Sequence, residues 1–81
     1  MTNYVYAVFN ADGNPIGLSR VIDEKTAKDT LSLDFYKGKT NRVLTGTRYE
    51  THVLTRTLPT LSELDAQLIA DEVTPQQVPL D

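Results

Sequence analysis

The chain contains no cysteine, so disulfide bonds and thiolate metal sites are excluded. A domain of 81 residues buries only about 60–65% of the surface that its unfolded chain exposes. Many domains of this size depend on a cross-link, a metal or a partner. With 40% apolar and 23% charged residues, the composition is that of one globular domain. Hydrophobic burial therefore has to stabilise the fold, and formation of a homodimer would bury further apolar surface.

The chain also lacks an excess of basic residues and a long apolar run. Eight Lys and Arg stand against eleven Asp and Glu, for a net charge of −3. This balance disfavours nucleic-acid binding, which usually requires a basic stripe. The apolar run at residues 4–9 is far shorter than the roughly 20 residues that cross a membrane. The first basic residue is Arg20, so the start of the chain lacks the charged region of a secretory signal, and we expect a cytoplasmic protein.

The strongest pattern is an alternation in which every odd position from 43 to 57 is β-branched or aromatic. This period of two predicts a strand with Arg48, Glu50, His52 and Arg56 on one face. A straight strand over residues 42–58 would measure about 54 Å. A globule of this size is only about 30 Å across. We therefore expect two strands, at about 41–45 and 47–57, separated at Gly46, and the pattern leaves open which face is buried.

The first third of the chain predicts a hairpin. Residues 4–9 are apolar on both alternating faces, which is typical of a strand covered on both sides. Residues 10–15 contain the turn pairs Asp-Gly and Asn-Pro, and residues 16–19 form a short returning strand.

Two helices are expected. Asp23 is a good N-cap for the first, whose apolar stripe at 27, 31 and 35 predicts a helix that extends to Tyr36. Residues 31–36 also alternate like a strand, so a helix that ends near Leu31, followed by a hairpin across 37–41, is the alternative. Thr60 and Glu63 form a capping box for the second helix, which is expected to reach about Glu72.

These elements predict an α+β domain with an antiparallel sheet of three or four strands and one or two helices packed on one face. The expected order is β-β-α-β(-β)-α over residues 1–73. Residues 74–81 contain two prolines and are expected to form an extended or mobile tail.

Two short motifs imitate ligand loops but lack essential members. Gly38-Lys39-Thr40 resembles the end of a phosphate-binding loop, but Leu33 stands where that loop requires glycine. Asn10, Asp12 and Asn14 have the spacing of a calcium loop, but Pro15 and Val21 replace its glycine and glutamate. With a single histidine and no partnered nucleophile, we expect no cofactor, no metal, no catalytic residue and no enzymatic activity.

We therefore expect a non-enzymatic protein-interaction module that binds a larger protein. Small accessory or inhibitory proteins of phages and mobile elements often act in this way. The candidate contact residues come from the alternating segment and from the acidic second helix: Arg48, Tyr49, Glu50, His52, Arg56, Glu63, Asp65, Asp71 and Glu72. One alternative is nucleic-acid binding through the strand face of Arg48, His52 and Arg56. The other is a self-assembling phage structural or assembly subunit, whose exposed strand edge is completed by a neighbouring copy.

Overall fold

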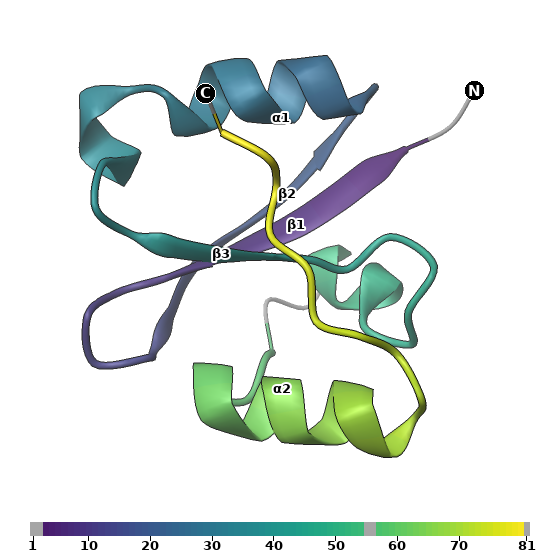
Figure 1. Cartoon of the computed structure of the whole chain (residues 1–81). Coiled ribbons are helices and arrows are strands. Elements are labelled where there is room, and N and C mark those ends of the chain that lie inside the picture. The colour runs from purple at the N-terminus through teal and green to yellow at the C-terminus, as the bar shows by residue number, and fades with distance from the viewer. Residues whose placement is uncertain (1–2, 55–56, 81) are drawn as a thin grey trace.

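A computed structural model describes residues 3–54 and 57–80. It is a three-stranded antiparallel sheet with one α-helix on each face (Figure 1). The elements are β1 (Tyr4–Phe9), β2 (Pro15–Val21), α1 (Glu24–Leu31), the 3-10 helix η1 (Asp34–Tyr36), β3 (Thr40–Val43), the 3-10 helix η2 (Glu50–Leu54) and α2 (Leu61–Ala70). The strand order is β2-β1-β3. The α+β class and the order β-β-α-β-α are confirmed.

The central strand is β1, and all its residues from Val5 to Phe9 are buried. Both neighbours are antiparallel to it: Tyr6 lies opposite Ser19 on β2 and opposite Val43 on β3. Its apolar residues on both faces require cover on both sides, as the sequence predicts.

The helices lie on opposite faces of the sheet, so the expectation that they share one face is wrong. The odd side chains of β1 join a buried cluster with Leu64 and Leu68 of α2. The even side chains join a second cluster with Ala27 and Leu31 of α1. A strand that is apolar at every position exposes one row of side chains unless each face is covered, which accounts for this arrangement.

The hairpin between β1 and β2 is confirmed. The Asn10 side-chain oxygen accepts hydrogen bonds from the backbone N–H groups of Asp12 and Asn14, at 2.9 and 3.0 Å. Gly13 adopts a φ of 81°, which glycine tolerates without strain, and its carbonyl accepts the N–H of Leu61 at 2.7 Å. The turn thus also positions the start of α2.

Helix α1 ends at Leu31, so the longer helix to Tyr36 is wrong and the shorter alternative holds. Asp23 is the N-cap, as predicted, and accepts the backbone N–H of Thr26 at 2.8 Å. Leu33 takes an extended conformation that interrupts the helix, and η1 follows as a separate turn. The hairpin expected across residues 37–41 does not form, because the chain passes from that turn directly into β3.

The long alternation does not form the expected strand over residues 47–57. Strand β3 ends at Val43, and the chain continues through turns into η2 (Figure 1). The Thr47 hydroxyl and N–H both donate to the carbonyl of Leu44, at 2.7 and 3.0 Å, and Gly46 has a φ of 80°. The Thr47 side chain thus forms its hydrogen bond with a backbone carbonyl three residues earlier, and this bond favours a turn over a strand. The principal extents of 33 × 31 × 24 Å agree with the limit on strand length.

The capping box of α2 is confirmed: Glu63 N–H donates to the Thr60 hydroxyl, and the Glu63 side chain accepts the Thr60 N–H. After α2, residues 74–80 run in an extended path beside β3 (Figure 1). Val43 N–H donates to the Gln76 carbonyl at 2.8 Å, and Val78 N–H donates to the Asn41 side chain at 2.6 Å. Val78 is buried in the α1-side cluster, so this segment closes one end of the core.

Candidate functional site

Three of the candidate contact residues join the loop at residues 44–49 to α2. Arg48 Nε lies 3.0 Å from the Asp71 carboxylate, and its Nη2 donates to Gln67 at 2.5 Å. The buried Tyr49 donates its hydroxyl to the same Gln67 oxygen. The Arg48 guanidinium also lies 5.1 Å from the centre of the Tyr49 ring. These contacts attach the loop to the helix.

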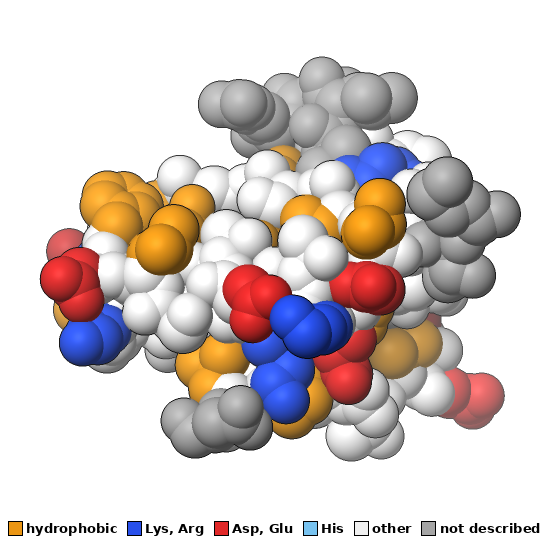
Figure 2. All heavy atoms as spheres, turned by 90° about the horizontal axis from the view of Figure 1, so that it is seen from above, with side chains coloured by type: hydrophobic (Ala, Val, Ile, Leu, Met, Phe, Trp, Pro, Cys, Tyr) orange, Lys and Arg blue, Asp and Glu red, His pale blue; other side chains and the backbone are white. Residues whose placement is uncertain are grey.

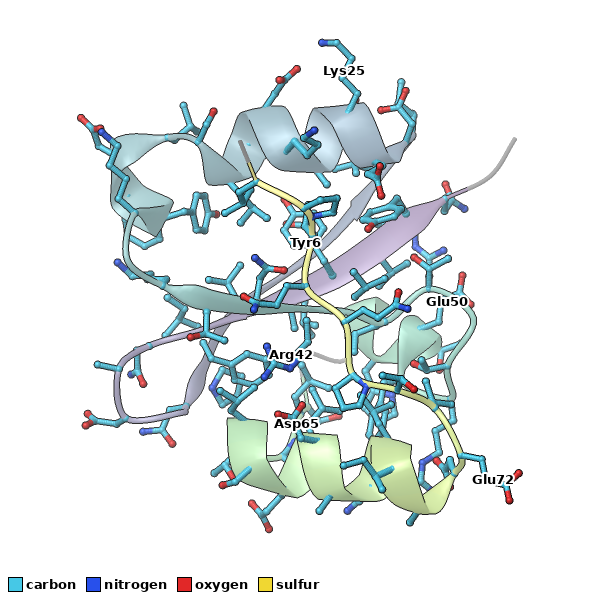
Figure 3. All side chains as sticks on the ribbon, viewed as in Figure 1. Tyr6, Lys25, Arg42, Glu50, Asp65 and Glu72 are labelled. Atoms are coloured by element: carbon cyan, nitrogen blue, oxygen red, sulfur yellow. The ribbon has the colours of Figure 1, made fainter. Side chains whose placement is uncertain are left out.

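Asp65 forms an ion pair with Arg42 that sequence reasoning missed. Arg42 donates from Nε and Nη2 to the two Asp65 oxygens, at 2.8 and 2.9 Å (Figure 3). Only 16% and 26% of the two side chains are exposed. The two residues are 23 positions apart, so no local pattern indicates the pair. It connects β3 to α2.

The remaining candidates do not form one row. Glu63 belongs to the capping box, where hydrogen bonds from Thr60 hold the pKa of its carboxyl below its ordinary value. The Glu50 carboxylate accepts the N–H of Gly46 at 3.3 Å, and the His52 ring lies 5.0 Å from the Tyr49 ring. Glu72 is exposed beyond the end of α2. Arg56 lies outside the described residues. Because η2 replaces the strand, the face proposed for nucleic acid does not form, and a role for these residues in partner binding stays a prediction.

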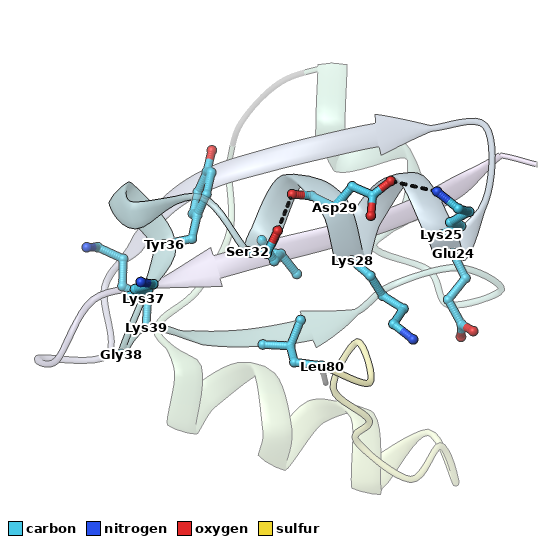
Figure 4. A pocket seen from close by; sticks show the side chains of 11 residues that line it. Glu24, Lys25, Lys28, Asp29, Ser32, Tyr36, Lys37, Gly38, Lys39 and Leu80 are labelled. Atoms are coloured by element: carbon cyan, nitrogen blue, oxygen red, sulfur yellow. Dashed lines mark hydrogen bonds and ion pairs between the residues drawn. The ribbon is translucent and has the colours of Figure 1, made fainter.

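The structure reveals a different candidate: a pocket of about 590 Å³ on the α1 side of the sheet (Figure 4). Its walls come from α1, from the turn after η1, and from Leu80 in the C-terminal segment. Leu31 and Tyr36 add apolar surface to the lining. Hydrogen bonding of residues 76 and 78 to β3 brings Leu80 to this position, so the pocket depends on the tertiary fold.

All four lysines of the chain line this hollow, which we call the lysine pocket: Lys25, Lys28, Lys37 and Lys39. Figure 4 shows two of them on α1 and two in the turn that follows η1. As part of a ligand site, sequence reasoning considered only Lys39, within the incomplete phosphate motif. The clustering of every lysine within residues 25–39 was a visible signal, but the path of the chain between α1 and β3 was needed to interpret it.

The lysines have local partners on the surface. Lys25 pairs with Asp29 at 3.0 Å and Lys37 with Asp34 at 3.1 Å, and both members of each pair are mostly exposed. A hydrogen bond from Lys25 to Asp29, together with the charge of that carboxylate, raises the pKa of Lys25. Lys39 donates to the Phe35 carbonyl at 2.6 Å, and its Nζ lies 4.9 Å from the Phe35 ring centre.

Three exposed apolar side chains belong to the lining of the lysine pocket or adjoin its lining residues in the chain. Leu33 and Phe35 flank its lining residues along the chain, and Leu80 lines it; we call these three residues the apolar rim. The Phe35 ring packs edge-on against Tyr36, with centroids 4.9 Å apart. Figure 2 looks onto this side of the molecule, where acidic and basic side chains gather near its middle and apolar side chains lie around them. The site therefore combines charge with apolar surface.

No protein-family model, no curated protein and no solved structure matches this chain. Within residues 3–54 and 57–80, no three His, Asp or Glu side chains come together in a way that would hold a metal ion. None of the helices in the described part of the chain is long and apolar enough to cross a membrane.

Proposed function

We propose that this chain is a small non-enzymatic interaction module that binds a larger protein through the lysine pocket and its apolar rim. The observation that carries the proposal is that three exposed apolar side chains are associated with this hollow. The six exposed large hydrophobic residues of the described chain are Ile16, Ile22, Leu33, Phe35, Ile69 and Leu80. Half of them form the apolar rim. Apolar side chains gathered beside a hollow are typical of a protein contact surface.

The arrangement of polar and apolar groups supports the proposal. Protein interfaces combine an apolar centre, often with aromatic side chains, and a polar periphery that stays in contact with water. Phe35 and Leu80 supply apolar surface for such a centre, and the exposed ammonium groups of Lys25 and Lys37 supply polar groups for its periphery.

The attachment of the pocket walls to the core is a second support. Leu31 of the lining is buried in the α1-side cluster, and Val78, two residues before Leu80, lies in the same cluster. A surface held in place by the core loses less conformational freedom when it binds than a mobile one.

The test is affinity capture followed by chemical cross-linking, with the whole chain as bait and an extract of the organism that encodes it. Phe35→Ser removes the largest side chain of the apolar rim. Ile69→Ser on α2 is the matched control, because Phe35 and Ile69 are both 64% exposed. We expect the captured protein to be lost with Phe35→Ser and retained with Ile69→Ser. Loss with both variants, or with neither, would contradict the proposal.

A further inference from the structure

We propose that the lysine pocket recognises an acidic segment of the partner, in which carboxylates flank an apolar side chain. This inference rests on the proposed function and adds the chemistry of the partner to it.

The distribution of positive charge is the first argument. The chain has a net charge of −3, yet its four lysines line one hollow with the acids Glu24 and Asp29. Asp34 pairs with Lys37 beside it, so positive charges outnumber negative ones there by one. In contrast, Arg42 and Arg48 are held by acids of the α2 side. The lysine pocket therefore attracts carboxylates although the whole molecule is acidic, because association is guided by the charges of the contact surface.

The freedom of the lysines to change partners is the second argument. Lys25 and Lys37 are paired with acids three or four residues away, in exposed contacts that water and salt weaken. An ammonium group on a flexible four-carbon stem can turn toward a new carboxylate without a change of the backbone. A bound acidic segment would exchange these intramolecular contacts for contacts with the partner.

The apolar lining explains why the ligand is a peptide segment and not a free anion. Leu31, Tyr36 and Leu80 line the same hollow as the lysines. Its volume of about 590 Å³ is large enough to accommodate a whole side chain. An inorganic ion would leave the apolar lining in water, whereas a leucine side chain between carboxylates would cover it.

The acids among the lysines argue against a nucleic-acid backbone. A bound strand runs along a continuous positive groove. Here Glu24 and Asp29 line the pocket beside the lysines, and Asp34 pairs with Lys37. This mixture of charges suits a short segment whose carboxylates reach individual ammonium groups.

The test is fluorescence anisotropy with the whole chain and a labelled peptide that carries several aspartates around one leucine. Two matched peptides replace either the aspartates by asparagine or the leucine by serine. We expect the acidic peptide to bind most tightly, the serine peptide more weakly, and the asparagine peptide not measurably. Raising the salt from about 50 to about 300 mM should weaken binding several-fold, because it screens exposed charges.

The decisive variant is Lys37→Gln with Lys39→Gln, which should raise the dissociation constant about tenfold, or about 1.4 kcal/mol. Its control is Ser62→Glu with Ala66→Glu on the exposed side of α2, which changes the net charge by the same −2 and should leave binding within about twofold. Equal losses with both variants would overturn the inference. So would binding of the asparagine peptide as tight as that of the acidic one, or tighter lysine-dependent binding of ATP or of a DNA oligonucleotide.

The two proposals fail in different ways. If the captured protein depends on Phe35 but not on Lys37 and Lys39, the proposed function stands and the acidic segment is wrong. If the peptide binds through the lysines but no captured protein depends on Phe35, the pocket chemistry stands and the proposed function is wrong.

Discussion

The two sides of the sheet use positive charge in opposite ways. On the α2 side, Arg42 and Asp65 form a two-bond pair that is 16% and 26% exposed. On the α1 side, Lys25 and Asp29 are 83% and 69% exposed and share one contact. The planar guanidinium matches both oxygens of a carboxylate, whereas an ammonium group is a compact and strongly hydrated charge. Arg42 and Arg48 therefore connect elements of the fold, whereas Lys25 and Lys37 remain on the surface.

The backbone conformations at the C-terminal ends of the two α-helices also differ. The C-cap residue of α1, Ser32, has an ordinary φ of −82°. Beyond α2, Glu72 has a φ of 64°, a left-handed conformation in which glycine is favoured. The N–H groups of Glu72 and Val73 donate to the carbonyls of Ile69 and Leu68 and complete a Schellman motif. The α2 side thus accepts backbone strain to turn the chain toward β3.

The largest expected effect tests the paired charges. Asp65→Ala leaves the Arg42 guanidinium partly buried without its carboxylate, so we expect a loss of about 2–3 kcal/mol in the free energy of unfolding. Asp29→Ala, which removes an exposed carboxylate from α1, should leave the urea midpoint unchanged. Urea unfolding followed by circular dichroism measures both variants. Equal losses would remove the contrast between the two sides.

A rescue variant separates the pair from the packing around it. Arg42→Met combined with Asp65→Leu removes both charges and keeps apolar volume between β3 and α2. Because no unpaired charge remains, we expect this protein to unfold within about 1 kcal/mol of the natural chain. A double variant as unstable as Asp65→Ala would show that the geometry of the pair itself is required.

The next effect concerns the turn after α2. Glu72→Gly relieves the left-handed conformation and should raise the free energy of unfolding by about 1 kcal/mol. Ser32→Gly at the end of α1 is the control. It should bring no gain, because Ser32 is unstrained and its hydroxyl donates to the Asp29 carbonyl at 2.7 Å. A gain at both positions would mean that the two helix ends do not differ.

The smallest effect is a difference in acid sensitivity. Hydrogen bonds from Thr26 lower the pKa of Asp23, the N-cap of α1, below its ordinary value of 3.8. Its contribution to stability is therefore complete above that value and is lost as the pH falls through the folded pKa. Asp23→Asn keeps the cap but not the charge, so its stability should fall less steeply than that of the natural chain below about pH 4. Unfolding measured at several acidic pH values provides the comparison, and parallel curves would contradict it.

The sequence indicated the fold where local chemistry was sufficient. Apolar residues on both faces of 4–9, the turn at 10–15 and the caps at Asp23 and Thr60 all depend on near neighbours, and all are confirmed. The alternation after Val43 wrongly predicted a strand. Threonine is common in strands, but its hydroxyl can also hydrogen-bond to the nearby backbone and stabilise a turn, as Thr47 does. Sequence reasoning also missed the site, since the lysine pocket requires Leu80 to lie beside α1.

The sequence by itself determined the class of fold, the central strand, both helix starts and the presence of every lysine within residues 25–39. These features follow from the spacing of apolar residues, from helix capping and from residue composition, all of which can be read from the sequence without knowing long-range contacts. Only the tertiary structure decided that the helices take opposite faces, that Arg42 reaches Asp65 and that residues 76 and 78 hydrogen-bond to β3. These pairings join residues far apart in the chain, where burial and hydrogen-bond satisfaction select among many partners that local pattern does not distinguish.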